Sequence, residues 1–255
     1  FISDKRAMVP DFMDNRVERK VANYHLQDTL DNYKLATETI GEFSIDYLDV
    51  HFNVVKSSAG VKHVISGSGD KKYTIKLKHA SSGTQTVVPL NLIVEYYSRH
   101  FDPQESMNTS LFRYLQDNDK LADFNTAKNI GEIEKKNVHI IIEEPELSLY
   151  PESQCRLIDF LVDRCFVHRP SYNMTLMMAT HSPYIVNYIN LLLCRGQHDN
   201  QAGIINLKPS EIGMYHIVEG QAVPLNIVSD GTAIVDTRLM SDTISQIYQE
   251  YNSIK

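Results

Sequence analysis

The chain has 255 residues, of which 42% are hydrophobic and 22% charged, so it can bury a sizeable core as one large domain or two small ones. With 25 basic against 32 acidic residues its net charge is -7, which argues against a nucleic-acid surface covering the whole protein but allows a local basic groove. No apolar run approaches the roughly 18 residues of a membrane span. Three cysteines without a CxxC pair exclude a disulfide framework and suit a cytoplasmic protein.

The pattern of apolar residues in the N-terminal part predicts a helix followed by strands. Apolar residues recur at three- and four-residue steps over residues 14–40, which predicts a long surface helix. Residues 43–79 change to a period of two, in two alternating runs separated by the turn-forming residues 67–70. This pattern predicts an antiparallel meander.

A helical apolar segment follows from Ser81 to about Tyr97. Residues 102–137 are polar and irregular, and we interpret them as an insertion with short helices.

From residue 138 onward the pattern is that of an α/β protein. Short, nearly all-apolar strands are expected at 138–142 and 174–179, an amphipathic helix at 152–167, and a further helix from about Ser182. Such alternation predicts a parallel sheet buried on both faces. The end repeats the theme more weakly, with a strand at 214–218, a turn at Glu219-Gly220 and a terminal helix over 233–251. We therefore predict one continuous α/β domain over residues 1–255.

Carboxylates follow the first of these apolar strands. Glu143, Glu144 and Glu146 come directly after residues 138–142, and the carboxyl edge of a parallel sheet is where open α/β folds bind ligands. Of two such acids, one can hold Mg²⁺ and the other can orient or deprotonate an attacking water. An acidic cap ahead of the next helix would explain the same residues.

His181 follows the second apolar strand, ahead of a helix that we expect Ser182 to cap and Pro183 to begin. Its imidazole can hydrogen-bond a phosphate oxygen or the attacking water. Alternatively, it merely closes a strand-to-helix turn. Its place at a strand end, like that of the two acids, favours the functional interpretation.

Residues 80–85 (ASSGTQ) join the meander to the next helix. Small residues at a helix start expose backbone N–H groups that favour an anion such as phosphate. An ordinary helix N-cap has the same composition, so this short motif is of low specificity.

Taken in order, these segments resemble the ATP-binding-cassette (ABC) type of AAA ATPase. The similarity is to the branch with SMC-like heads and to the "overcoming lysogenization defect" family and related phage-defence ATPases. Residues 81–85 look like the signature motif, 140–145 like the Walker B strand, 147–150 like the D-loop and 180–183 like the switch-histidine segment. The resemblance extends from about Asp46 to the C-terminus.

This resemblance implies an ABC-ATPase-like head with a parallel sheet core flanked by helices, an antiparallel β-meander and a helical insertion at 102–137. It further implies ATP and Mg²⁺ as cofactors. Glu144 would be the general base, Glu143 the Mg²⁺-associated acid and His181 the γ-phosphate sensor. The nucleotide-binding residues would be Ser81, Ser82, Gly83 and Gln85.

The same resemblance implies partners. Ser82 and Gly83 would touch the γ-phosphate of ATP held by a second copy, in a head-to-tail homodimer. ATP turnover would switch DNA engagement or a separate effector protein such as a nuclease or toxin, in phage defence or DNA maintenance. No membrane partner is implied.

Two features depart from the family pattern. Glu143 stands where ABC ATPases usually have Asp. No GxxxxGK[ST] phosphate loop occurs, since residues 67–72 have the wrong spacing and fall between two expected strands. Together with the initial Phe1, this leads us to expect that the N-terminal part with the loop lies outside these residues and that this chain alone is inactive.

Two other functions stay open. Without a phosphate loop the chain could be a non-catalytic scaffold that keeps a degenerate ATPase fold. Metal-dependent nuclease chemistry by Glu143, Glu144, Glu146 and His181 is the third reading. It is the least favoured because the further carboxylate or lysine cluster typical of nucleases is not identified.

Overall fold

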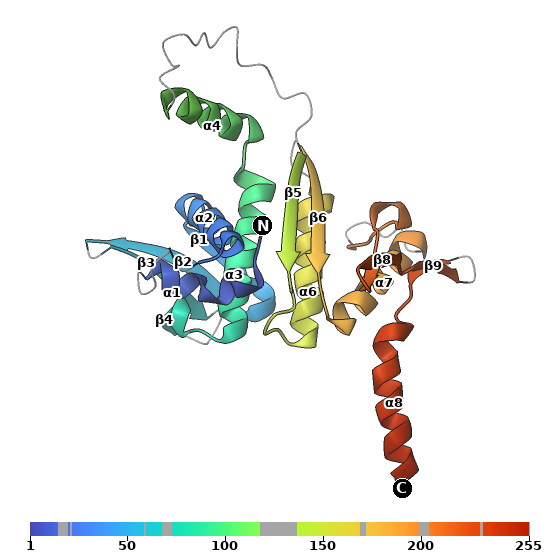
Figure 1. Cartoon of the computed structure of the whole chain (residues 1–255). Coiled ribbons are helices and arrows are strands. Elements are labelled where there is room, and N and C mark those ends of the chain that lie inside the picture. Colours follow the sequence, from blue (N-terminus) through green and yellow to red (C-terminus); the bar gives the residue numbers. More distant parts are fainter. Residues whose placement is uncertain are drawn as a thin grey trace. The chain divides into compact units, whose positions relative to one another are not determined.

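The computed structural model groups the chain into two compact units (Figure 1). Residues 1–148 with 163–179 form the first unit, and residues 149–162 with 180–255 form the second. The fold mixes helices and strands, as an α/β prediction requires. The residues that the structure describes are 1–14, 20, 22–58, 60–67, 73–117, 137–168, 172–198, 204–229 and 232–254.

The first unit contains both predicted sheet types. Its helical segments, which include short 3-10 and π-helical turns, are η1 (Asp4–Met8), α1 (Val9–Met13), α2 (Tyr24–Thr39), η3 (Asp46–Leu48), η4 (Leu77–His79), α3 (Ser82–Glu95), η5 (Tyr96–His100), α4 (Pro103–Asp117) and η7 (Asp163–Val167). Its strands are β1 (Glu42–Ile45), β2 (Val50–Ser57), β3 (Gly60–Gly67), β4 (Thr74–Lys76), β5 (Asn137–Glu143) and β6 (Asn173–Ala179).

The predicted meander is an antiparallel sheet in the order β1-β2-β3-β4. Two alternating runs were expected, but the sheet has four strands because β2 turns back into β3 after Ser57, opposite Gly60. Gly60 has a φ of 110°, which only glycine adopts without strain. Phe52 and Ile65 face each other in register and are both fully buried. Of the turn expected at 67–70, only Gly67 lies within the described residues.

Helix α2 is shorter than the helix expected over 14–40. It begins at Tyr24 because the side chain of Asn23 accepts a hydrogen bond from the Leu26 N–H at 2.9 Å, which caps the first turn. Residues 15–19 and 21 of the expected helix lie outside the described residues. The buried Tyr33 joins α2 to the meander, since its hydroxyl lies 3.2 Å from Nδ1 of His63 on β3.

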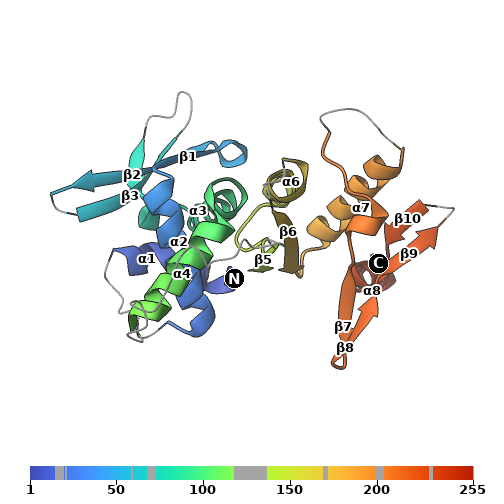
Figure 2. The same ribbon diagram turned by 90° about the horizontal axis from the view of Figure 1, so that it is seen from above.

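Helix α3 confirms the helix expected after Ser81. Each of its residues from 86 to 94 is buried. Figure 2 shows α2 and α3 beside the meander. In the described part of the insertion expected at 102–137, α4 is a 15-residue helix, longer than the short helices expected. Residues 118–136 of the insertion lie outside the described part.

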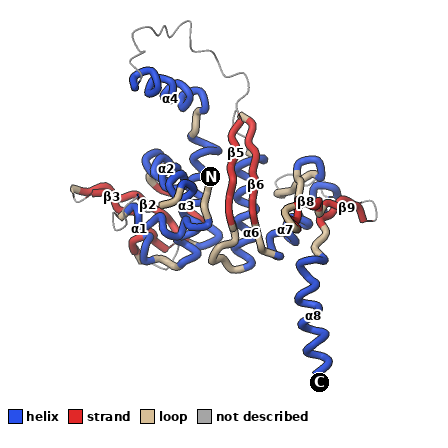
Figure 3. Tube along the Cα trace, viewed as in Figure 1, coloured by secondary structure: helices blue, strands red, loops and turns tan. Residues whose placement is uncertain are grey.

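Strands β5 and β6 form the parallel pair seen in red in Figure 3. Among the described residues the parallel sheet has only these two strands, extended by a bridge between Ile2 and Ile142, so it is smaller than the parallel core that we predicted. Ile140 and Ile142 are buried, whereas Met177 on β6 is 66% exposed. Only one face of the pair is therefore well covered within this unit, although both were expected to be buried.

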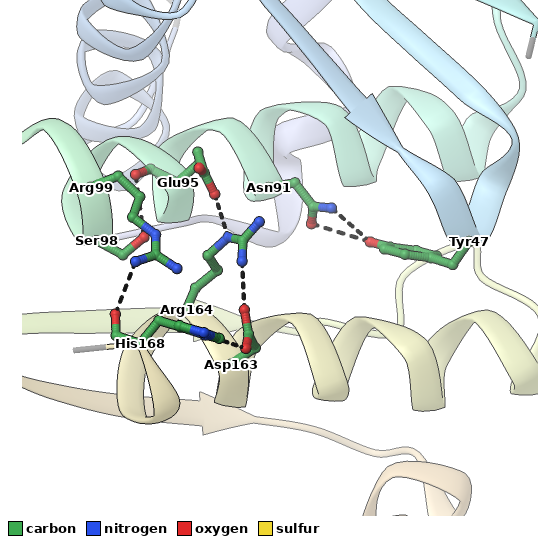
Figure 4. A network of polar contacts seen from close by, with 8 residues as sticks. All are labelled: Tyr47, Asn91, Glu95, Ser98, Arg99, Asp163, Arg164 and His168. Carbon is green, nitrogen blue, oxygen red and sulfur yellow. Dashed lines mark hydrogen bonds and ion pairs between the residues drawn. The ribbon is translucent and has the colours of Figure 1, made fainter. Parts of the chain in front are cut away.

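A polar network ties α3 and η5 to η7 (Figure 4). The Arg164 guanidinium donates to Glu95 Oε2 at 2.5 Å and pairs with Asp163. Arg99 donates to the carbonyl of His168 at 3.1 Å. The network thus links two π-helical turns, a rare local structure that is often found near functional sites.

The second unit packs two helices together and adds strand pairs. Its elements are α6 (Pro151–Val162), α7 (Pro183–His198), η8 (Pro209–Glu211), β7 (Tyr215–Val218), β8 (Gln221–Pro224), β9 (Asn226–Ser229), β10 (Thr232–Val235) and α8 (Arg238–Ile254). Leu157, Ile158 and Leu161 of α6 and Ile185, Ile189 and Leu192 of α7 are all buried.

The C-terminal residues depart from the predicted α/β theme. β7 pairs with β8 as an antiparallel hairpin through Glu219 and Gly220, and β9 and β10 are also paired antiparallel. The terminal helix begins at Arg238 and not at residue 233, because residues 232–235 form β10. Asn190 of α7 holds that strand by exchanging hydrogen bonds with the backbone N–H and C=O of Val235.

Within the described part of the chain, none of the helices combines the length and the apolar character that crossing a bilayer requires.

Candidate functional site

The two adjacent acids lie where the sequence placed them, at the carboxyl end of β5. Glu143 is the last residue of β5 and is paired in register with Ala179, the last residue of β6. The N–H of Glu144 donates to the Ala179 carbonyl at 2.8 Å. Both carboxylates are half-buried, so each side chain is held by the fold while retaining access to a ligand.

Glu144 begins a tight turn in an uncommon backbone conformation. Its carbonyl accepts from the N–H of Leu147 at 3.0 Å, and Pro145 occupies the second position of the turn, where its fixed φ is favoured. The φ of Glu144 is 44°, and that of Ser148 is 60°. Such left-handed values in non-glycine residues are strained and occur preferentially at functional sites.

A residue that the sequence did not single out holds this turn. Arg6 is completely buried, and its guanidinium donates to the carbonyl oxygens of Glu143 at 2.7 Å, Glu144 at 2.6 Å and Pro145 at 3.4 Å. The backbone N–H of Asp4 lies 3.4 Å from Glu143 Oε2. The N-terminal segment thus contacts both acids, and no local pattern in residues 1–11 signals it.

The segment resembling a signature motif lies at the N-terminus of α3. Ser81 caps the helix by accepting from the Thr84 N–H at 3.2 Å, and Ser81 and Ser82 are exposed while Gly83 is half-buried. The Gln85 amide donates to the carbonyl of Ala80 at 2.8 Å and to that of Lys78 at 3.1 Å. The loop before the helix is therefore tied down, and the small residues at its tip face solvent.

Helix α3 also contacts the loop after the acids. The hydroxyl of Thr86, one turn into the helix, lies 3.0 Å from the carbonyl of Leu147 and 2.9 Å from that of Gly83. Within the first unit, the signature-like helix is therefore in direct contact with the loop that follows the acid turn.

The segment around His181 belongs to the second unit. Ser182 caps α7 through its hydroxyl, which accepts from the Ile185 N–H at 3.3 Å, and Pro183 begins the helix, as predicted. Ser182 also donates to Gln154 of α6 at 2.5 Å. His181 is exposed beside this buried contact. Its placement opposite Glu144 stays a prediction, because the two residues belong to different units.

No three Asp, Glu, His or Cys side chains of the described residues gather into a metal centre. Mg²⁺ is usually held by one or two protein carboxylates, while substrate phosphates and waters complete its shell. Glu143, half-buried at the strand end, offers such a carboxylate.

The chain is similar to a known family of protein domains over most of its length. No curated protein matches the chain. The family model described as "AAA ATPase domain" matches residues 1–186, a stretch that includes the acid turn, the start of α3 and His181. Membership of that family indicates nucleotide binding and hydrolysis. Because the match covers well over half of the sequence, the chain belongs to the AAA ATPase domain family.

Proposed function

We propose that the chain is the catalytic-acid and signature part of an ABC-type ATPase head, similar to SMC-like heads and phage-defence ATPases. The observation that carries this proposal is the position of Glu144, one residue beyond a parallel strand and within a turn that contacts the signature-like helix through Leu147 and Thr86. General bases that activate water in nucleotide hydrolysis occupy such strand ends.

In the proposed site the two acids have separate tasks. Glu144 orients the attacking water and accepts its proton, and Glu143 holds Mg²⁺. When bound, Mg²⁺ neutralises charge on the transferring phosphoryl group. Both carboxylates are half-buried, and a partly dry site strengthens electrostatic interactions with the nucleotide.

The start of α3 is proposed to bind the γ-phosphate of ATP held by a second copy of the chain. Ser82 and Gly83 present small side chains and helix N-terminal N–H groups, a combination that favours phosphate. Ser81 and Gln85 keep this loop in place through their hydrogen bonds to Thr84, Lys78 and Ala80. A direct contact of either residue with nucleotide stays a prediction. A head-to-tail homodimer follows from this arrangement.

His181 is proposed to sense the γ-phosphate through its exposed imidazole. Its loop is supported on both sides: Thr180 Oγ1 accepts from the Ser182 N–H at 3.0 Å, and Ser182 is held by Gln154.

The full protein is proposed to use ATP turnover to switch a partner, either DNA or a separate effector such as a nuclease or toxin, in phage defence or DNA maintenance. This part of the proposal rests on the resemblance to SMC-like and defence ATPases. It also requires a phosphate loop from outside the 255 residues, because they contain no GxxxxGK[ST].

The test is ATP turnover by the purified full gene product, with and without double-stranded DNA, alongside Glu144→Gln. We expect the variant to bind ATP and to lose about 100-fold or more of its turnover, the scale on which removal of a general base acts. Glu146→Gln, a half-buried acid of the same turn, is the matched control and should keep turnover. Equal turnover in wild type and Glu144→Gln would refute the proposed role of Glu144.

The missing phosphate-loop motif favours one other function, a scaffold that keeps the fold without hydrolysis. ATP binding by the full gene product excludes that alternative. A protein that neither binds nor hydrolyses ATP would support it.

A further inference from the structure

Every N–H donor of the Arg6 guanidinium has a main-chain acceptor. Nη1 donates to Ser3 and Glu143, Nη2 donates to Glu144 and Pro145, and Nε donates to the carbonyl of Thr86 at 3.2 Å. An arginine has five such donors in a rigid planar fork. All five donors find carbonyl oxygens because three separate segments of the backbone fold against this side chain.

Burying this charge is costly unless it is compensated. Arg6 is 0% exposed, and burial lowers its pKa to about 10, against the opposing effect of Glu146, Asp4, Glu144 and Glu143. The group therefore stays protonated at neutral pH. A hydrophobic side chain would avoid this desolvation cost, but it would leave the five carbonyl oxygens without the donors that Arg6 supplies.

The contacts of Arg6 centre on the strained residue of the site. Glu144 has a φ of 44°. The Arg6 guanidinium donates to the carbonyls of Glu143 and Glu144, which lie on either side of the strained Glu144 Cα. Strained conformations persist only where the surroundings over-determine them. Together with the bond from the Glu144 N–H to Ala179, the two Arg6 bonds fix the direction in which the Glu144 side chain leaves the backbone.

Arg6 also joins this turn to the signature-like helix. Its Nε binds the carbonyl of Thr86, whose hydroxyl contacts Leu147 on the far side of the turn. One rigid group therefore connects the first turn of α3 with the backbone of Glu144.

We propose that Arg6 is a positioning residue for the general base: it sets the backbone of Glu144 for water activation and couples that setting to the helix that begins at the signature-like segment. This inference rests on the proposed function, because it assigns Arg6 a role through Glu144. It adds a residue that lies far from every motif of the site in sequence.

The experiment uses the full gene product and four variants: Arg6→Lys, Arg6→Gln, Glu144→Gln and the double variant Arg6→Lys/Glu144→Gln. Lysine keeps the charge but offers three donors without the planar fork. Steady-state ATP turnover, ATP affinity and melting temperature are measured for each. Arg164→Lys is the control, because Arg164 is a partly buried arginine whose ion pairs, with Glu95 of α3 and Asp163 of η7, lie away from the acid turn.

We expect Arg6→Lys to lower kcat by about 10- to 100-fold, as small misplacements of a reacting group do, with ATP affinity little changed. In the double variant turnover should equal that of Glu144→Gln within about twofold, because a positioning residue has no effect once the positioned carboxylate is gone. Arg164→Lys should lower the melting temperature without lowering kcat.

Three results would overturn the inference. Normal kcat in Arg6→Lys, while Glu144→Gln is inactive, would leave the proposed function standing and remove the role of Arg6. The same would follow if Arg6→Lys lowered the residual turnover of Glu144→Gln by a further similar factor, or if both Arg6 variants lost turnover only in proportion to lost folded protein. An inactive wild type, or an active Glu144→Gln, would instead refute the proposed function and the inference with it.

Discussion

The side-chain oxygen of Gln154 accepts a 2.5 Å hydrogen bond from the hydroxyl of Ser182, while its side-chain nitrogen donates to the carbonyl of Leu149 at 2.9 Å. Gln154 is buried at 7% exposure. One amide therefore connects the loop that resembles the D-loop with the loop that carries His181.

Replacing Gln154 by Leu should destabilise the protein by about 1–3 kcal/mol, because the Leu149 carbonyl and the Ser182 hydroxyl would be left buried without these partners. Urea unfolding measures this free energy. Glu152→Gln, at an exposed position of the same helix, is the control and should change stability by less than about 0.5 kcal/mol. A Gln154→Leu protein as stable as the control would contradict the assigned contacts.

Substitutions of the neighbouring residues Ser81 and Ser82 should have different effects, one on folding stability and the other on ATP turnover. Ser81 caps α3, so Ser81→Ala should cost about 0.5–2 kcal/mol of folding free energy. Ser82 is exposed, so Ser82→Ala should leave stability within about 0.5 kcal/mol while lowering ATP turnover if this residue meets the γ-phosphate. Thermal unfolding and turnover of both variants provide the comparison; full turnover in Ser82→Ala would remove that residue from the proposed site.

His63 should make folding sensitive to mild acid. Burial lowers its pKa from 6.5 to about 4, and the weaker effect of Asp14 opposes this shift. Because the folded pKa is the lower one, the unfolded chain takes up the proton first as pH falls below 6.5, and stability declines until about pH 4. At pH 5 the loss from this residue is about 2 kcal/mol relative to pH 7.

The measurement is the free energy of unfolding at pH 7 and pH 5 for wild type and His63→Asn. Asparagine does not titrate, so the variant should lose less stability over this interval, although its stability at pH 7 is lower. Equal losses in the two proteins would show that other groups cause the pH dependence.

The turn between β7 and β8 should accept a stabilising substitution. Glu219 and Gly220 have φ values of 48° and 79°, the left-handed pair that two-residue hairpin turns require and that Asn-Gly supplies best. Glu219→Asn should therefore raise stability by a few tenths of a kcal/mol, and Gly220→Ala should lower it by about 1 kcal/mol. Differential scanning calorimetry of the two variants, which change in opposite directions, checks both signs.

Local patterns in the sequence were sufficient for several elements. The apolar runs at 138–142 and 174–179 predicted β5 and β6, and the residues after Ser81 and around Ser182 predicted the starts of α3 and α7. These features depend on neighbours a few residues away, through side-chain burial and backbone capping. The position of the acids after a parallel strand could therefore be foreseen.

Elements that depend on distant partners could not be foreseen in the same way. Residues 232–235 have an ambiguous pattern, and they form β10 because β9 and Asn190 of α7 supply partners for their backbone. The extra hairpin strand β3 likewise exists because β2 and β4 flank it in the sheet. Hydrogen bonding across the fold, and not local propensity, selected these conformations.

The sequence by itself determined which residue types stand at the strand ends and helix starts, and hence the kind of chemistry that the chain can support. Only the tertiary structure decided which residues hold the two acids in place. Arg6 lies 137 residues before Glu143 in the chain, yet its guanidinium donates hydrogen bonds to the carbonyls of Glu143 and Glu144. A buried cation is tolerated only where several oxygens converge on it. That convergence depends on folding around the side chain, which no local pattern of residues records.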